Sequence, residues 1–183
     1  TYGENVTGFG DVAKQYDELF WGKCHSSQEF LELLAQVPLV AQPGTTFNYS
    51  YSTDVLGAIV EKISGKKLGQ FLQERLFDPL GMDRSGFHLS KRPELLANVA
   101  RMYAPGTAAA PSLGILEPGG VDWKLAPFQT SIGGCEKNDS AGGGMFASSS
   151  DYLKYISMMA DGGKFKGEQI IKEEIAAIQF QNL

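Results

Sequence analysis

The chain has 183 residues, of which 43% are hydrophobic, enough to bury one core but too few for two comfortable domains. Lys and Arg together number 16 against 21 Asp and Glu, which gives a net charge of −5 at pH 7. This balance provides no basic stripe for a phosphate backbone, so nucleic-acid binding is not expected. No apolar run approaches the roughly 20 residues that cross a bilayer, so no membrane-spanning helix is expected. We therefore expect a single domain over residues 1–183.

Two helices are predicted near the start of the chain. Apolar residues recur at helical spacing from Asp11 to Phe20. A second helix is indicated by Ser26 and Glu29, which have the spacing of a capping box, and Pro38 stops it.

The strongest helical pattern begins at Ser52, which we expect to cap the helix, and ends at Gly65. A further amphipathic stripe runs from Leu68 to Phe77 and is closed by Pro79 and Gly81. Because the linker between these two helices is short and both stripes need burial, they are predicted to form an antiparallel or steeply crossing pair.

Residues 104–141 are rich in proline and glycine and show no periodicity, so this segment is predicted to be a functional wall or a packing surface. A helical pattern begins again at Ser148, which is predicted to cap a helix that ends at Gly162. A last helix is marked from Ile171 and is expected to run to the end of the chain. Alternating strand patterns are scarce. The best candidates are residues 98–103 and 145–147, so the fold class is mainly α, with α+β character.

The serines of the sequence do not form a recognisable nucleophile motif. The elbow motif GxSxG does not occur, and the one SxxK match, from Ser64 to Lys67, is expected by chance and falls at a helix end. A structural role is therefore predicted for Ser64. His25 and His88 have no ligand or carboxylate at a useful spacing on their own elements, so both are predicted to be surface residues.

Metal, disulfide and phosphate sites are also not indicated. Cys24 and Cys135 form no CxxC and have no nearby His pair, so we expect neither a zinc site nor a bond between them, and no cofactor. The glycines at 142–144 could cradle a phosphate at a helix N-terminus, but they lack the Lys and Ser or Thr of a P-loop. A close backbone approach is the preferred interpretation of these glycines.

Several blocks resemble the serine β-lactamase-like superfamily, and most closely the esterases related to class C β-lactamases (family VIII carboxylesterase type). They are Thr1-Tyr2-Gly3, which is similar to the segment after an early HTSGL stretch, Pro43 to Tyr51, Asp54 to Gly57, Pro79 to Met82, and Gly142 to Asp151, which is similar to GGGxxSTxxD. The resemblance implies the helical lobe of the β-lactamase and penicillin-binding-protein-like fold, with few short strands. It also implies an internal fragment, because the SxxK and KTG or HxG segments of the family are not found at their places.

The resemblance also implies roles for particular residues. Tyr49 falls on the family tyrosine that works in proton transfer with the SxxK lysine, and a phenol needs such an ammonium to act at neutral pH. Tyr51 stands where lactamases place Asn, which favours esters over β-lactams and would line an acyl pocket. Gly142 and Gly143 are assigned to substrate binding.

The implied function is part of a serine hydrolase that forms an acyl-enzyme with a small-molecule ester or β-lactam and needs no metal or cofactor. Two alternatives remain open. The chain could be a non-catalytic binding or structural module built on the same helical lobe, or a phosphate-binding protein that uses Gly142 to Gly144.

Overall fold

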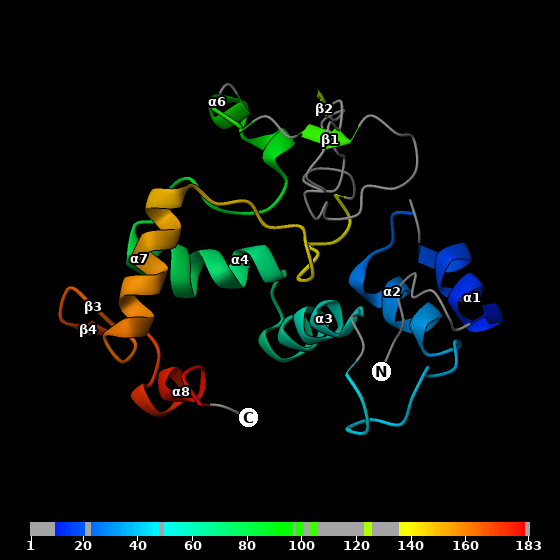
Figure 1. Ribbon diagram of the computed structural model, residues 1–183. Helices are drawn as coiled ribbons and strands as arrows, with labels where there is room; N and C mark the ends of the chain where they lie inside the picture. The colour runs from blue at the N-terminus through cyan, green and yellow to red at the C-terminus, as the bar shows by residue number, and fades with distance from the viewer. Residues whose placement is uncertain are drawn as a thin grey trace.

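The computed structural model describes residues 10–20, 23–47, 50–96, 98–100, 103–105, 123–125 and 136–181. Helices make up most of the regular structure in these ranges (Figure 1). The helices are α1 (Gly10–Phe20), α2 (Ser27–Leu34), α3 (Ser52–Ser64), α4 (Leu68–Leu72), the π-helical turn η1 (Gln73–Phe77), α5 (Asp78–Leu80), the 3₁₀ turn η2 (Leu89–Lys91), α6 (Pro93–Leu96), α7 (Ser149–Ala160) and α8 (Glu173–Ile178). None of the described helices is long and apolar enough to cross a membrane.

The described strands form two small antiparallel pairs. They are β1 (Tyr103–Pro105) with β2 (Trp123–Leu125), and β3 (Lys164–Phe165) with β4 (Glu168–Gln169). The mainly helical fold class predicted from the sequence is confirmed for the described residues.

The local signals at the helix ends work as expected. The Ser26 hydroxyl accepts the Glu29 amide at 3.3 Å, and the Glu29 carboxylate accepts the Ser26 amide at 2.8 Å, so the predicted capping box of α2 is present. Gly65 ends α3 with a φ of 69°, the left-handed conformation that glycine adopts without strain. The Ser148 hydroxyl accepts the Asp151 amide at 3.2 Å and caps α7. The described parts of these helices therefore follow from short-range chemistry.

The start of α3 differs from the prediction. Ser52 is the first helical residue rather than the cap, and Tyr51 holds the cap position without a side-chain hydrogen bond. The hydroxyl of Ser50 accepts the Ser52 amide at 3.3 Å and lies 2.6 Å from the Ser52 hydroxyl. Ser50 thus forms a local serine turn before the helix, and Ser52 lies inside the helix that it was predicted to cap.

The described residues form two apolar clusters. The first cluster joins α1, α2 and the start of α3. The second cluster joins α5, α7 and α8, and α4 lies between the two clusters (Figure 1). The Tyr16 hydroxyl in the first cluster donates to the carbonyl oxygen of Pro38 at 3.0 Å, which ties α1 to the end of the α2 segment. The buried members are Tyr16, Phe20, Phe30, Leu34 and Val37 in the first cluster, and Phe77, Leu80, Met82, Met158, Met159 and Ala176 in the second.

The predicted pair of helices after residue 52 is confirmed as two helical segments in contact, α3 and α4 with its continuation through η1. The predicted strand at 98–103 is wrong over residues 98–100. The Asn98 amide donates to the carbonyl of Leu95 at 2.9 Å, so this segment closes a turn after α6. At 145–147 only Phe146 pairs, as an isolated antiparallel bridge with Gly86.

The C-terminal region also differs from the prediction. The last helix, α8, begins at Glu173 and ends at Ile178, where the described chain goes into turns. Before it, the β3–β4 hairpin reverses through Lys166 and Gly167, with φ values of 50° and 87°. Both residues have the positive φ of the hairpin turns that suit twisted strands.

Cys24 forms a disulfide, which contradicts the expectation that the two cysteines stay unlinked. Cys135, the only other cysteine in the sequence, lies outside the described residues. Sequence separation gave no hint of a bond, but the fold brings the flanking segments together, because the Ser27 hydroxyl donates to the side-chain oxygen of Asn138 at 3.1 Å.

Candidate functional site

A short segment, residues 138–144, connects three helices of the described fold, and we call it the glycine strap. Asn138 accepts the Ser27 hydroxyl from α2. Asp139 accepts the Gly69 amide of α4 at 2.8 Å, and Ser140 reaches α3. The strap therefore holds together helices that lie far apart in the sequence.

Asp54, in the first turn of α3, fixes the centre of the glycine strap. Its Oδ1 accepts the Ser140 hydroxyl at 2.7 Å and the Gly142 amide at 3.2 Å. A carboxylate in the first turn also interacts favourably with the positive end of the helix dipole, which stabilises the helix. The start of α3 and the strap thus form one hydrogen-bonded junction, which we call the Asp54 junction.

The glycines of the strap are not equivalent. A Cβ on Gly142 would overlap Oδ2 of Asp54, and a Cβ on Gly144 would lie 2.9 Å from the carbonyl oxygen of Ser140. Gly143 has open space around it. The predicted close backbone approach is confirmed at Gly142 and Gly144, while Gly143, which is exposed like Gly142, has no such close neighbour.

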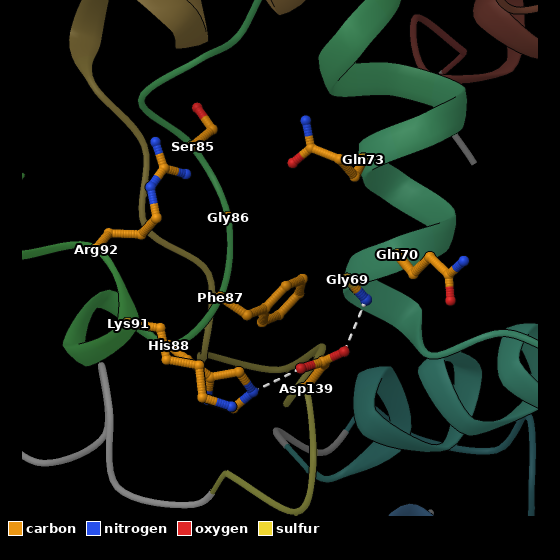
Figure 2. A pocket seen from close by; sticks show the side chains of 10 residues that line it. All are labelled: Gly69, Gln70, Gln73, Ser85, Gly86, Phe87, His88, Lys91, Arg92 and Asp139. Atoms are coloured by element: carbon orange, nitrogen blue, oxygen red, sulfur yellow. Dashed lines mark hydrogen bonds and ion pairs between the residues drawn. The ribbon is translucent and has the colours of Figure 1, made fainter.

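An open pocket of about 250 Å³ lies beside the strap, between α4 and residues 85–92 (Figure 2). Nε2 of His88 lies 2.6 Å from Oδ1 of Asp139, whose other oxygen accepts the Gly69 amide. The His88 side chain is only 14% exposed, so the prediction of a surface histidine is wrong. Its partner lies 51 residues away, on another segment, where a search along one element cannot find it.

The basic side chains of this pocket have acidic or carbonyl partners. Lys91 pairs with Glu136 at 3.4 Å, and Arg92 pairs with Glu94 at 2.5 Å and donates to the carbonyl of Asp83 at 2.7 Å. An anion entering the pocket would compete with these partners, so the charges do not favour an anion site. The other histidine, His25, does not line this pocket. It is half-buried, and its Nε2 lies 2.9 Å from the carbonyl oxygen of Leu19.

Tyr49, the candidate proton-transfer residue, lies outside the described residues. Tyr51 is described, and its half-buried ring lies among aromatic rings of α1 and α2. Its centroid is 5.1 Å from that of Phe20, 5.7 Å from that of Phe30, and 6.4 Å from that of Tyr16, on which it stacks. This packing fixes the chain just before α3 to the first apolar cluster.

The SxxK match does not form a catalytic pair. The Ser64 hydroxyl accepts the Lys66 amide at 3.2 Å, whereas the Lys67 ammonium lies 3.3 Å from the carbonyl of Lys137 and 3.9 Å from Glu61. The structural role predicted for Ser64 is confirmed. Across the described ranges, no three His, Cys, Asp or Glu side chains come together as a metal site.

A second carboxylate fixes α7, which follows the strap. Asp151 is 1% exposed and accepts the Arg84 amide at 2.8 Å, the Ser85 hydroxyl at 3.0 Å and the Lys154 ammonium at 2.9 Å. Burial opposes ionisation of this carboxyl, but these three donors outweigh it and hold the pKa of Asp151 below its ordinary value.

The Beta-lactamase family model matches residues 7–181. The chain belongs to the beta-lactamase family. It is 31% identical over 173 residues to Protein Rv1367c of Mycobacterium tuberculosis (strain ATCC 25618 / H37Rv), covering 94% of this chain and 39% of that protein. Esterase EstB of Burkholderia gladioli is 32% identical over 131 residues, covering 70% of this chain and 33% of EstB.

A solved structure gives the same assignment. EstCE1, described as a hydrolase with promiscuous acyltransferase activity, matches with a TM-score of 0.68 and 30% identity over 94% of this chain and 44% of EstCE1. This beta-lactamase-family chain therefore has the helical lobe predicted from the sequence, and it spans less than half the length of these relatives. The relatives that match this chain include an esterase and a hydrolase with promiscuous acyltransferase activity.

No holding role was predicted from the sequence for Asp54, Asp139 or Asp151. Asp54 and Asp151 carry one local signal, a carboxylate in the first turn of a helix. That signal predicts helix stabilisation, and the tertiary partners of all three carboxylates appear only in the folded chain.

Proposed function

We propose that this chain forms the helical lobe and one wall of the active-site cleft of a serine hydrolase that acts on carboxylic esters. In the proposed reaction a serine attacks the ester carbonyl, the alcohol leaves with a proton, and water then releases the acid from the acyl-enzyme. The nucleophile and its lysine come from outside residues 1–183. Within the chain, Tyr49 transfers the proton, and Tyr51, Gly142 and Gly143 contact the substrate.

The Asp54 junction is the observation that carries the proposal. It holds Gly142 against the first turn of α3, and α3 begins three residues after Tyr49. Tyr51, the residue before α3, and the glycines assigned to substrate binding are thus on neighbouring pieces of backbone that the junction connects. A proton-transfer group and a binding wall need this kind of fixed relation to act on one substrate.

Tyr49 needs a neighbouring cation in this role. An ordinary phenol has a pKa of about 10 and is a poor base at neutral pH. A nearby ammonium lowers that pKa by favouring the phenolate, and the lysine of an SxxK motif would supply it. Ser64 and Lys67 do not provide such a pair, because each is bonded elsewhere at the end of α3.

Esters are favoured over β-lactams as substrates. Tyr51 occupies the place of the asparagine found in lactamases. Among the relatives, EstB is an esterase and EstCE1 is a hydrolase with promiscuous acyltransferase activity. An aromatic side chain here narrows the pocket around the acyl group. A β-lactam substrate remains the secondary possibility for the same site.

The outer faces of α3 and α7 support the assignment of residues 1–183 as one lobe of a larger fold. Exposed apolar side chains lie on α3, where Ile63 is 82% exposed, and on α7, where Leu153 is 62% exposed. Faces of this kind usually pack on another part of a protein. The other members are Leu56, Ile59, Tyr152 and Ile156.

The test is to incubate the full-length protein with a p-nitrophenyl ester and with a fluorophosphonate, then locate any labelled serine by mass spectrometry. We expect ester turnover and one labelled serine outside residues 1–183. The 183-residue chain expressed alone should show neither turnover nor label. Stoichiometric labelling of Ser64 would contradict the proposal, and a full-length protein without label or turnover would favour the alternative of a non-catalytic module.

A further inference from the structure

We propose that Asp54 is a positioning residue that fixes the glycine strap relative to the first turn of α3. This inference rests on the proposed function and names a residue that the sequence motif does not assign to the reaction. Asp54 would act through Ser140 and Gly142, and it would not contact the reacting atoms.

The geometry of the Asp54 junction supports a holding role. One oxygen, Oδ1, accepts both a side-chain donor, the Ser140 hydroxyl at 2.7 Å, and a backbone donor, the Gly142 amide at 3.2 Å. A charged acceptor makes stronger hydrogen bonds than a neutral one. The other oxygen, Oδ2, lies where a Cβ of Gly142 would be, so only glycine allows this approach.

A neighbouring contact keeps the strap close to α3. Gly57, one turn after Asp54, lies against Ala141, and a Cβ on Gly57 would be 2.7 Å from the Cβ of Ala141. At this point only the Ala141 methyl group separates the strap from the backbone of α3, which leaves little room for a shift. Small displacements of the strap therefore change the position of Gly142 and Gly143 directly.

Other contacts hold the two ends of the strap, so Asp54 fixes only its middle. Asn138 is held by Ser27, Asp139 by Gly69 and His88, and the Gly144 amide donates to the carbonyl of Ser140 at 2.9 Å. These contacts remain when Asp54 is removed. Loss of Asp54 should therefore free the middle of the strap without unfolding the lobe.

The experiment uses the full-length protein with Asp54→Ala, Asp54→Asn and Ser140→Ala, and the double variant Asp54→Ala with Ser140→Ala. The control is Asp161→Asn, which changes an exposed carboxylate after α7. For each protein kcat and KM are measured on a p-nitrophenyl ester. Amide hydrogen exchange is followed at Gly142 and at Gly144.

We expect Asp54→Ala to raise KM about tenfold and to change kcat less than about threefold, because the binding wall moves while the proton-transfer group stays. Asp54→Asn should stay within about threefold of wild type, since its amide oxygen can still accept both donors. The double variant should be no worse than Asp54→Ala, because both changes remove one junction. Exchange should accelerate at least tenfold at Gly142 in Asp54→Ala and change little at Gly144.

Each other result overturns the inference in a recognisable way. A fall in kcat at constant KM, with Asp54→Asn as impaired as Asp54→Ala, would show that the charge acts on the reaction itself. Faster exchange at Gly142 with unchanged KM would reduce Asp54 to a purely structural contact. A wild-type protein without ester turnover would remove the proposed function and this role with it, whereas unchanged kinetics in an active enzyme would remove the positioning role alone.

Discussion

The buried carboxylate of Asp151 accepts a hydrogen bond at 3.0 Å from the hydroxyl of Ser85, which lies 66 residues earlier in the chain. The same carboxylate accepts the Arg84 amide and pairs with Lys154. This contact fixes the start of α7 to the turn after Met82 and closes the second apolar cluster from one side.

We expect Asp151→Ala to lower the free energy of unfolding by about 1.5–3 kcal/mol, since a charged acceptor is lost and its buried donors stay unpaired. Burial opposes ionisation of Asp151, but the hydrogen bonds hold its pKa below the unfolded value of about 3.9. Its stabilising effect is therefore full above that value and is lost as pH falls through the folded pKa. Urea unfolding of the full-length protein between pH 3 and pH 7 should show a steeper acid loss in wild type than in Asp151→Asn.

Two glycine variants test the strap as a matched pair. Gly142→Ala should destabilise the protein by about 1–3 kcal/mol, because the new methyl group overlaps the Asp54 carboxylate. Gly143→Ala should cost little stability, since nothing lies within 4 Å of its Cβ position. Thermal unfolding of both variants measures the difference, and equal losses would show that Gly142 does not approach Asp54 this closely.

The disulfide of Cys24 predicts a covalent link to Cys135, the only other cysteine in the sequence. A closed loop of this length contributes on the order of 4–5 kcal/mol in the chain-entropy model. Peptide mapping without reductant should recover the two cysteine peptides joined, and dithiothreitol should lower the unfolding midpoint of wild type but not of Cys24→Ser. Two free thiols in the oxidised, purified protein would contradict the link.

Tyr51 links the proposed acyl pocket to the aromatic packing before α3. Tyr51→Asn should shift the preference between bulky and small acyl groups by about 1–3 kcal/mol in kcat/KM, because the wall beside the acyl group is removed. Tyr51→Phe is the control, since it keeps the ring that packs on Phe20 and Phe30. A series of p-nitrophenyl esters from acetate to octanoate measures the profile, and an unchanged profile in Tyr51→Asn would remove Tyr51 from the pocket.

The sequence predicted the helices well because their signals are local. The capping box of Ser26 and Glu29 and the left-handed Gly65 act within a single turn of chain, so spacing alone reveals them. Ser52 shows the limit of that reasoning. The hydroxyl of Ser50, two residues earlier, accepts the amide of Ser52 and shifts the cap to Tyr51.

The contacts of the candidate site could not be predicted, because their partners are distant in sequence. Asp54 and Ser140 are separated by 86 residues, and His88 and Asp139 by 51. No periodicity connects such pairs, and His88 also has a φ of 55°, which few non-glycine residues adopt. The family motif marked Tyr49 and the glycines, while the side chains that hold the strap came from the structure.

The central claim is that Tyr49 transfers the proton during acylation, and the pre-steady-state acylation rate of the full-length protein tests it most directly. Tyr49→Phe removes one hydroxyl and should lower that rate by about 10²–10⁴-fold. Tyr152→Phe, which changes a half-exposed tyrosine on α7, should leave it unchanged. A Tyr49→Phe protein that folds normally and acylates at the wild-type rate would contradict the claim.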